Sequence, residues 1–248
     1  MERIYKNPPL AEALCEFQFI PNVPWDLTIP GLIYGRIKDR FPRRKQQAGL
    51  GIQLRPTEKG VEHKIEPAPP RVQFLNQGET VLVQLAPDLL VVNQLKPYPG
   101  WLKFKSLIID TFNVYREIAN PKGIKRIGLR YINIFEFTSK NLRLDEYFNY
   151  YPFIPETMPK ALSSFLVRSE FPYSDEKEVL ILQLASIIPR DPDLSSLVLD
   201  LDYAMIAPEY ISLDDIEEWV EKAHDEIERT FETAINDKAR DLFMDGGQ

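Results

Sequence analysis

Cysteine and histidine are scarce in this sequence. Cysteine occurs once in 248 residues, at Cys15, and histidine occurs twice. A single cysteine excludes an intramolecular disulfide and any zinc site built on several cysteines, and such low usage is typical of a reducing compartment. We therefore expect a cytoplasmic protein, with no metal centre and no cofactor.

Long apolar runs are absent as well. No stretch approaches the roughly 20 consecutive apolar residues of a membrane span, and residues 1–6 lack the apolar segment of a signal peptide. We therefore expect neither export nor membrane insertion. Hydrophobic residues make up 44% of the chain and charged residues 27%, as in globular proteins. A chain of this length can bury a full core without disulfides, so we expect one compact body over residues 1–248.

Charge is distributed unevenly along the chain. The net charge is −7. Residues 1–124 hold 17 Lys and Arg against 12 Asp and Glu, whereas residues 125–248 hold 13 against 25, so the halves carry +5 and −12. Residues 212–248 hold twelve acids and four bases, a net of −8. A solvated helix face explains such a segment, and a docking surface for a basic partner is the alternative.

The first half predicts an antiparallel sheet and one long helix. Residues 14–19 alternate between apolar and polar side chains, which is typical of a half-buried strand. A helix is expected at 101–118, where apolar residues recur at helical spacing up to Asn120-Pro121. An antiparallel meander is predicted from three strands divided by turn signals, at 72–75, 80–86 and 89–95.

A basic segment separates the first strand from the meander. Residues 32–41 carry apolar side chains at helical spacing and predict a short helix that ends at Pro42. Residues 42–70 are rich in Pro, Lys, Arg, Gln and Gly, with two short strand candidates at 51–54 and 61–65. We expect a mobile or hairpin-like insertion here.

The second half repeats the order of three strands and a helix. After a strand at 126–137, the pattern predicts strands at 164–171, 179–187 and 196–206 and a long helix at 213–236. Residues 81–86 also align with residues 180–185, which makes pseudo-halves at 1–140 and 141–248 a hypothesis. The predicted class is α+β, with antiparallel sheet packed by two long amphipathic helices.

Nucleophilic catalysis would require a base beside Cys15. The two histidines, His63 and His224, are not linked to it by any motif. Cys15 shares the apolar face of its strand with Phe17, which favours a small buried residue. His224 follows Val220 by one helical turn and is expected at the edge of the apolar stripe. We assign no catalytic residue and favour a non-enzymatic role.

Two carboxylates, Asp200 and Asp202, project from one face of a predicted strand, and Glu170 is expected on a neighbouring strand. Three carboxylates could hold Mg²⁺ for a metal-dependent hydrolase or nuclease. Apolar residues alternate with them, however, as in any strand with one wet face. Arg126 and Arg130 share a face of their own strand, and we expect them to pair with nearby acids, a ligand site being the alternative.

A basic cluster lies at residues 36–45 and offers an anion-binding alternative. Nucleic acid would be its natural ligand, but no recognition motif flanks the cluster and the chain is acidic overall. A nucleic-acid-binding accessory protein is therefore kept as an alternative that we do not favour. The cluster consists of Arg36, Lys38, Arg40, Arg43, Arg44 and Lys45.

The opening segment Tyr5 to Phe19, with its Tyr-x-Asn-Pro-Pro-Leu-x-Glu-Ala-x-Cys-Glu-Phe-x-Phe pattern, resembles that of a sporadically distributed family of uncharacterised prokaryotic proteins of about this length. The segments 126–133, 223–237 and 240–243 are similar as well, so the likeness covers nearly the whole chain. The family brings no established activity. The resemblance implies, through the family's patchy occurrence, a component of a mobile defence or toxin–antitoxin-type system.

We therefore predict a non-enzymatic protein-binding subunit or accessory component whose partner is another protein. Its docking surface is expected on the acidic side of the last helix, where regular spacing presents a rigid field of negative charge. That surface comprises Glu217, Glu218, Glu221, Asp225 and Glu228.

Overall fold

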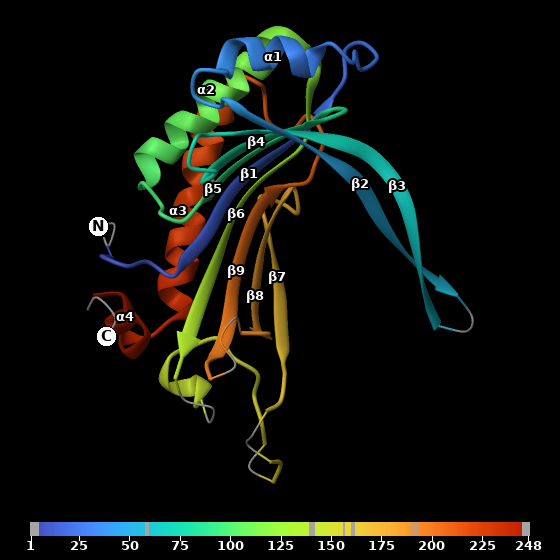
Figure 1. Cartoon of the computed structure of the whole chain (residues 1–248). Helices are drawn as coiled ribbons and strands as arrows, with labels where there is room; N and C mark the ends of the chain where they lie inside the picture. Colours follow the sequence, from blue (N-terminus) through green and yellow to red (C-terminus); the bar gives the residue numbers. More distant parts are fainter. Residues whose placement is uncertain are drawn as a thin grey trace.

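The nine strands form one antiparallel sheet in a computed structural model of the chain (Figure 1). Their order is β2-β3-β4-β5-β1-β6-β9-β8-β7. The structure describes residues 5–57, 60–138, 142–155, 157–159, 162–189, 191 and 193–244, and for residues 47–57 and 60–69 it describes the backbone alone. The predicted α+β class, an antiparallel sheet packed by helices, is confirmed.

The elements follow one another as β1 (Leu10–Ile20), α1 (Ile29–Ile37), β2 (Arg43–Thr57), β3 (Gly60–Leu75), β4 (Val81–Ala86), β5 (Leu89–Leu95), α2 (Trp101–Ala119), β6 (Gly123–Phe137), a short 3-10 helix (Leu144–Glu146), β7 (Leu166–Tyr173), β8 (Glu178–Ile187), β9 (Ser195–Met205), α3 (Ile216–Ala234) and α4 (Asp237–Met244). Each strand and long helix expected from the pattern is present, and α4 is an addition.

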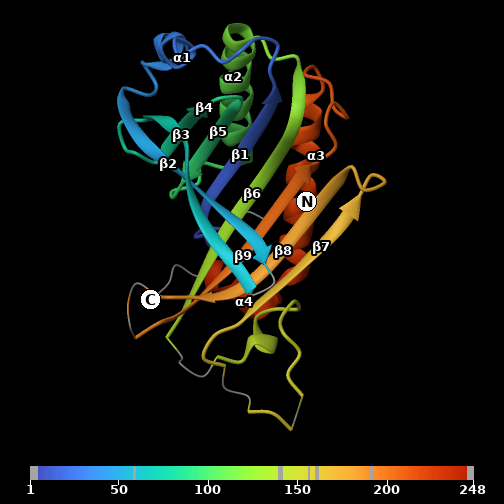
Figure 2. The ribbon, with the colours of Figure 1, turned by 90° about the vertical axis from the view of Figure 1, so that its right-hand side faces the viewer.

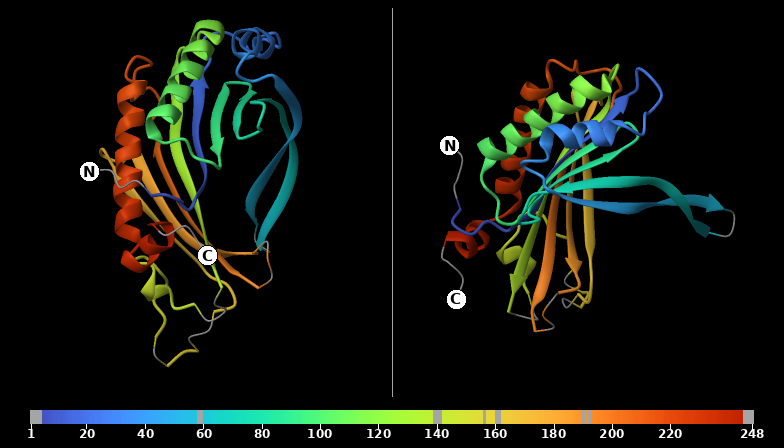
Figure 3. Two further views of the ribbon diagram at one scale, coloured as in Figure 1. Left: turned by 60° about the vertical axis from the view of Figure 1, so that its left-hand side comes forward. Right: turned by 45° about the horizontal axis from the view of Figure 1, so that its top comes forward.

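The core lies between one face of the sheet and the helices α2 and α3 (Figures 1 and 2). Successive side chains of a strand point to opposite faces, so Cys15 and Phe17 of β1 point to this face and are fully buried. Leu129 of β6 lies opposite Cys15 in the register and is also fully buried. In the part of the chain that the structure describes, no helix covers the opposite face, which we call the open face (Figure 3).

Helix α3 is shorter than the predicted 213–236 and ends at Ala234. It begins at Ile216, because Ser212 closes a turn before it, in which the Ser212 hydroxyl accepts a hydrogen bond from the Asp214 backbone N–H at 3.1 Å. Phe231 is only partly buried, whereas Trp219 and Ile227 are in the core. No described helix is long and apolar enough to span a membrane.

The insertion expected at 42–70 is a hairpin, as predicted, and its strands are longer than the candidates. β2 and β3 pair from Arg43 opposite Leu75 to Thr57 opposite Gly60, because backbone hydrogen bonds continue where the side-chain pattern is broken by Gly and Pro. Beyond β4 the hairpin extends away from the rest of the sheet as an arm (Figures 1 and 3).

Apart from β2, the strand order is symmetric about the central pair β1 and β6. The meander β3-β4-β5 adjoins β1, the meander β7-β8-β9 adjoins β6, and each meander is followed by a long helix, α2 or α3. The aligned segments 81–86 and 180–185 lie on β4 and β8, which occupy equivalent places. This symmetry divides the chain between α2 and β6, whereas the hypothesis of pseudo-halves placed the division at residue 140.

Candidate functional site

The open face carries a concentration of charged side chains at the centre of the sheet. Alternation along the strands puts Glu16 of β1, Arg126 and Arg130 of β6, and Asp200 and Asp202 of β9 on this face. Their side chains are between 11% and 42% exposed. The expectation that both arginines pair with nearby acids is confirmed.

Arg130 and Asp200 form the tighter of the two ion pairs. Arg130 donates from Nε to Oδ1 at 2.8 Å and from Nη2 to Oδ2 at 2.5 Å. The register places Arg130 opposite Asp202, so it reaches Asp200 diagonally. The hydrogen bonds to Asp200 raise the pKa of Arg130 above its usual value. Both carboxylate oxygens of Asp200 therefore already have a cationic donor.

Arg126 is held more loosely, between two acids. Its Nη1 lies 3.4 Å from Glu16 Oε1 and its Nη2 lies 3.2 Å from Asp202 Oδ2, both long for charge-assisted hydrogen bonds. Burial raises the pKa of Asp202, although Arg126 and Arg130 oppose that effect. The Arg126 guanidinium lies over Gly128, which has no side chain to displace it.

A chain of amide side chains extends the polar region toward the arm. Gln73 donates to Gln84 at 3.1 Å, Gln84 to Asn93 at 2.8 Å, and Asn93 to Glu12 at 2.7 Å. The chain crosses β3, β4, β5 and β1 in one row. The sequence analysis missed it, although single Gln and Asn residues inside apolar strands are a usable signal.

A β-bulge in β6 adds a second cation beside Arg126. The register pairs Gln18 with Arg126 and then Phe19 with Ile124, which leaves Lys125 as the extra residue. A bulge re-aims the side chains around it and is common next to binding sites. Lys125 is exposed, next to Arg126 in sequence.

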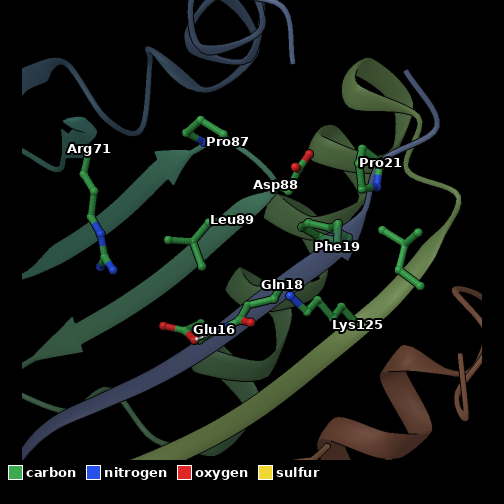
Figure 4. Close-up of a pocket in the computed structure, with 10 residues that line it drawn as sticks. Glu16, Gln18, Phe19, Pro21, Arg71, Pro87, Asp88, Leu89 and Lys125 are labelled. Carbon is green, nitrogen blue, oxygen red and sulfur yellow. Dashed lines mark hydrogen bonds between the residues drawn. The ribbon is translucent and has the colours of Figure 1, made fainter. Parts of the chain in front are cut away.

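The bulge borders a hollow of about 510 Å³ at the end of the open face (Figure 4). Arg71 of β3 and Lys125 of β6 extend over it from opposite sides of Leu89 and Gln18. Among the described residues neither cation has an ion-pair partner. Burial raises the pKa of Asp88, which also lines the hollow. The full lining is Glu16, Gln18, Phe19, Ile20, Pro21, Arg71, Pro87, Asp88, Leu89 and Lys125.

On α3, two of the five acids expected to dock a partner serve the protein's own packing. Glu221 accepts a hydrogen bond from Trp101 Nε1 at 3.1 Å and forms an ion pair with Lys105 at 2.8 Å. Glu217 binds the same lysine at 3.1 Å. The hydrogen bond from Lys105 lowers the pKa of Glu221. These contacts tie α3 to α2.

The other three acids lie along α3 with different exposure. Glu218 and Asp225 are exposed, and neither has an ion-pair partner in the described part of the chain. Glu228 is half-buried and does interact with its surroundings. The exposed acidic surface of α3 therefore rests mainly on Glu218 and Asp225.

The basic cluster at 36–45 is largely paired with acids of the same protein. Arg44 lies over the ring of Tyr34, 4.8 Å from its centroid, and Lys38 is exposed. The ion pairs join Arg36 to Glu117 at 2.9 Å, Arg40 to Asp110 at 3.0 Å, Arg43 to Glu79 at 2.8 Å and Lys45 to Glu79 at 2.7 Å. This local neutralisation weakens the case for nucleic-acid binding.

Cys15 and His224 lie on the core side of the sheet. Cys15 is fully buried, as expected, and burial raises its pKa well above the usual value. His224 was expected at a boundary but is buried, because its ring stacks on Trp101 at 3.9 Å and its Nδ1 lies 2.9 Å from the Tyr131 hydroxyl. His63 lies on β3, where side chains are outside the described residues.

Glu170 does not join Asp200 and Asp202. It lies on β7, which is separated from β9 by β8, and it pairs with Arg168. In the described part of the chain no three Asp, Glu, His or Cys residues are grouped as metal ligands. The expectation of three neighbouring carboxylates is therefore wrong, because the chain places β8 between them.

No family model matches the chain, and no curated protein matches it. Two solved structures of an RNA triphosphatase, Pct1 of S. pombe, are 9% identical to it. The one in complex with the Spt5 CTD has a TM-score of 0.14 and covers 95% of this chain and 83% of that one. The other has a TM-score of 0.15 and covers 96% and 82%. Similarities this weak carry no inference.

Proposed function

We propose that the chain is a binding protein that holds a small phosphate-bearing molecule in the hollow at the end of the open face. The observation that carries this proposal is the placement of two cations, Arg71 and Lys125, on opposite sides of one hollow, neither of them in an ion pair with any residue that the structure describes. A volume of about 510 Å³ falls within the range of small-molecule sites.

An anionic group such as phosphate fits these cations better than a neutral ligand does. The guanidinium group of Arg71 offers a planar pair of donors to two phosphate oxygens, and the Lys125 ammonium supplies a compact point charge. Arg126 follows Lys125 in β6 but does not line the hollow, and it is paired with Glu16 and Asp202, so the proposal rests on Arg71 and Lys125.

The acids of the hollow suit the remainder of such a ligand. Asp88 and Glu16 line the same space, and carboxylates accept hydrogen bonds from hydroxyl or amino groups. A ligand that carries both phosphate and hydroxyl groups would satisfy both kinds of side chain. The proposal is limited to binding. The alternative of a metal-dependent hydrolase is less favoured, because Arg130 donates to both carboxylate oxygens of Asp200.

Docking of a basic protein on α3 is a second candidate function. Its support is the pair of exposed acids Glu218 and Asp225 on the outer side of the helix. A role as an accessory component of a mobile defence or toxin–antitoxin-type system belongs to this candidate and rests on the family resemblance.

Titration calorimetry with orthophosphate, pyrophosphate and tripolyphosphate tests the ligand proposal. We expect binding that strengthens with the number of phosphates and that falls at least about tenfold in Lys125→Glu and in Arg71→Glu, since each variant replaces a cation by a repelling charge. Lys103→Glu, on the exposed side of α2, is the matched control and should bind as the wild type does. Equal binding by all four proteins, or no binding at millimolar phosphate, would overturn the proposal.

A further inference from the structure

Strand β7 is an edge strand with no partner on its outer side among the described residues (Figure 2). Ser186 N–H donates to the Phe165 carbonyl at 3.1 Å, so the odd-numbered residues of this strand direct their backbone groups to β8. The even-numbered residues Leu166, Arg168 and Glu170 therefore present theirs outward. Pro172, which has no N–H, also faces outward, as expected for an edge.

The sequence of β7 is symmetric in chemistry about Ser169. Arg168 precedes this serine and Glu170 follows it. Beyond each charged residue lie two apolar ones, Val167 and Leu166 on one side and Phe171 and Pro172 on the other. If two β7 strands pair antiparallel about a twofold axis at Ser169, the facing pairs are Arg168 with Glu170, Val167 with Phe171, and Leu166 with Pro172, each occurring twice.

Only this register pairs residues whose backbone groups both face outward and also places opposite charges across from each other. A twofold axis at Arg168 would place two arginines opposite each other, and an axis at Glu170 would place two glutamates opposite each other. Like charges directly across a pair of strands are destabilising, whereas opposite charges stabilise it. Arg168 and Glu170 already pair within one strand at 2.6 Å, so two copies would form a square of alternating charge.

We propose that β7 binds β7 of a second copy of this chain, antiparallel and with Ser169 facing Ser169 across the twofold axis. Arg168 and Glu170 then exchange backbone hydrogen bonds between copies, and the two sheets become one continuous sheet. The contact covers two exposed apolar side chains, Leu166 at 64% and Phe171 at 42% exposure. An edge strand offers unpaired backbone groups to another chain, and in this register the charges of β7, which would oppose pairing in others, are complementary.

Charge exchange at the interface tests the pairing. Light scattering after size exclusion should give about twice the 28.8 kDa of one chain for the wild type. Arg168→Glu and Glu170→Arg should each weaken dimerisation at least about tenfold, and the double variant should restore it, because only the double variant returns opposite charges to facing positions. Lys103→Glu makes the same change of charge on α2 and should leave the dimer intact.

A cysteine at the twofold axis gives an independent readout. Ser169 faces its copy in a non-hydrogen-bonded pair, where Cα atoms lie about 4.5 Å apart, within the range of a disulfide. Ser169→Cys should therefore cross-link into a covalent dimer under mild oxidation, and Ser212→Cys, exposed before α3, should not. A monomeric wild type at about 100 μM, a dimer indifferent to both single charge changes, or equal cross-linking of the two cysteine variants would overturn the proposal.

Discussion

The Arg126 guanidinium lies directly over Gly128, with Nη1 2.9 Å from the point where a Cβ of residue 128 would stand. Asp202 Oδ1 would lie 3.2 Å from the same point. A Cβ at residue 128 would therefore require the Arg126 side chain to shift from the position in which it contacts both Glu16 and Asp202. The position of Arg126 on the open face is therefore linked to the glycine at residue 128.

Gly128→Ala should displace Arg126 from its two acids. We expect a loss of no more than about 1 kcal/mol in the free energy of unfolding, because the flexible end of Arg126 can move aside and only its two partly exposed ion pairs are weakened. Urea denaturation measures it. Gly31→Ala is the control, because its added Cβ meets nothing within 4 Å in α1 and alanine favours a helix. A Gly128 variant as stable as the Gly31 variant would contradict the role given to Gly128.

Glu178 should make stability depend on acidic pH. Its side chain is 1% exposed and accepts from Trp219 Nε1 at 2.7 Å, from the Tyr203 hydroxyl at 2.9 Å and from Lys222 at 2.5 Å. Burial raises the pKa of Glu178, but these donors outweigh burial and bring it below 4.5. A lowered pKa in the folded state stabilises the protein above the unfolded pKa, and that stabilisation is lost as pH falls below it.

The comparison of wild type with Glu178→Gln isolates this effect. The wild type should be the more stable protein at pH 7, because the amide loses the ion pair with Lys222 and leaves a buried group imperfectly bonded. The difference in unfolding free energy should shrink as pH falls below about 4.5. A difference that stays constant from pH 7 to pH 3 would be evidence against the lowered pKa.

His224 should make stability depend on pH over a higher range than Glu178 does. Burial lowers its pKa from 6.5 to about 4, with Glu221 opposing that effect. The folded protein therefore holds the neutral ring while the unfolded chain takes up a proton near pH 6.5, so stability falls as pH decreases from about 6.5 to about 4. His224→Gln should remove this part of the pH dependence in thermal unfolding. A wild type and variant with parallel curves over that range would argue against it.

The elements of the fold could be predicted because their patterns are local. The apolar spacing in α2 and α3 and the alternation in β1 and β4 follow from the positions that must be buried. The order of strands could not be read in this way, since pairing depends on contacts between distant segments. The misplacement of Glu170 illustrates this, because nothing in its own sequence shows that β8 lies between it and Asp202.

The candidate site was predicted only in part, for a similar reason. Arg126, Arg130 and the two aspartates were found because they alternate with apolar residues. Lys125 and Arg71 were missed, because a bulge and a strand from the arm bring them to the hollow. A bulge depends on the mismatch between two strands, and a single sequence does not show that mismatch.

The acidic docking surface on α3 is the remaining prediction, and the structure changes how it should be tested. Reversal of Glu221 would break the contacts to Trp101 and Lys105, so a loss of binding would not separate docking from damage to the fold. Glu218→Lys with Asp225→Lys changes the charge of exposed side chains only. If a basic partner docks on α3, the pair should slow association and reduce its dependence on salt, because steering by the acidic surface is lost. Association with a protein that co-purifies from the native host measures both effects.

Arg40→Glu with Arg43→Glu is the comparison, since it reverses two exposed charges of the basic cluster. A partner lost by the arginine variant and kept by the α3 variant would move the interface to the basic cluster.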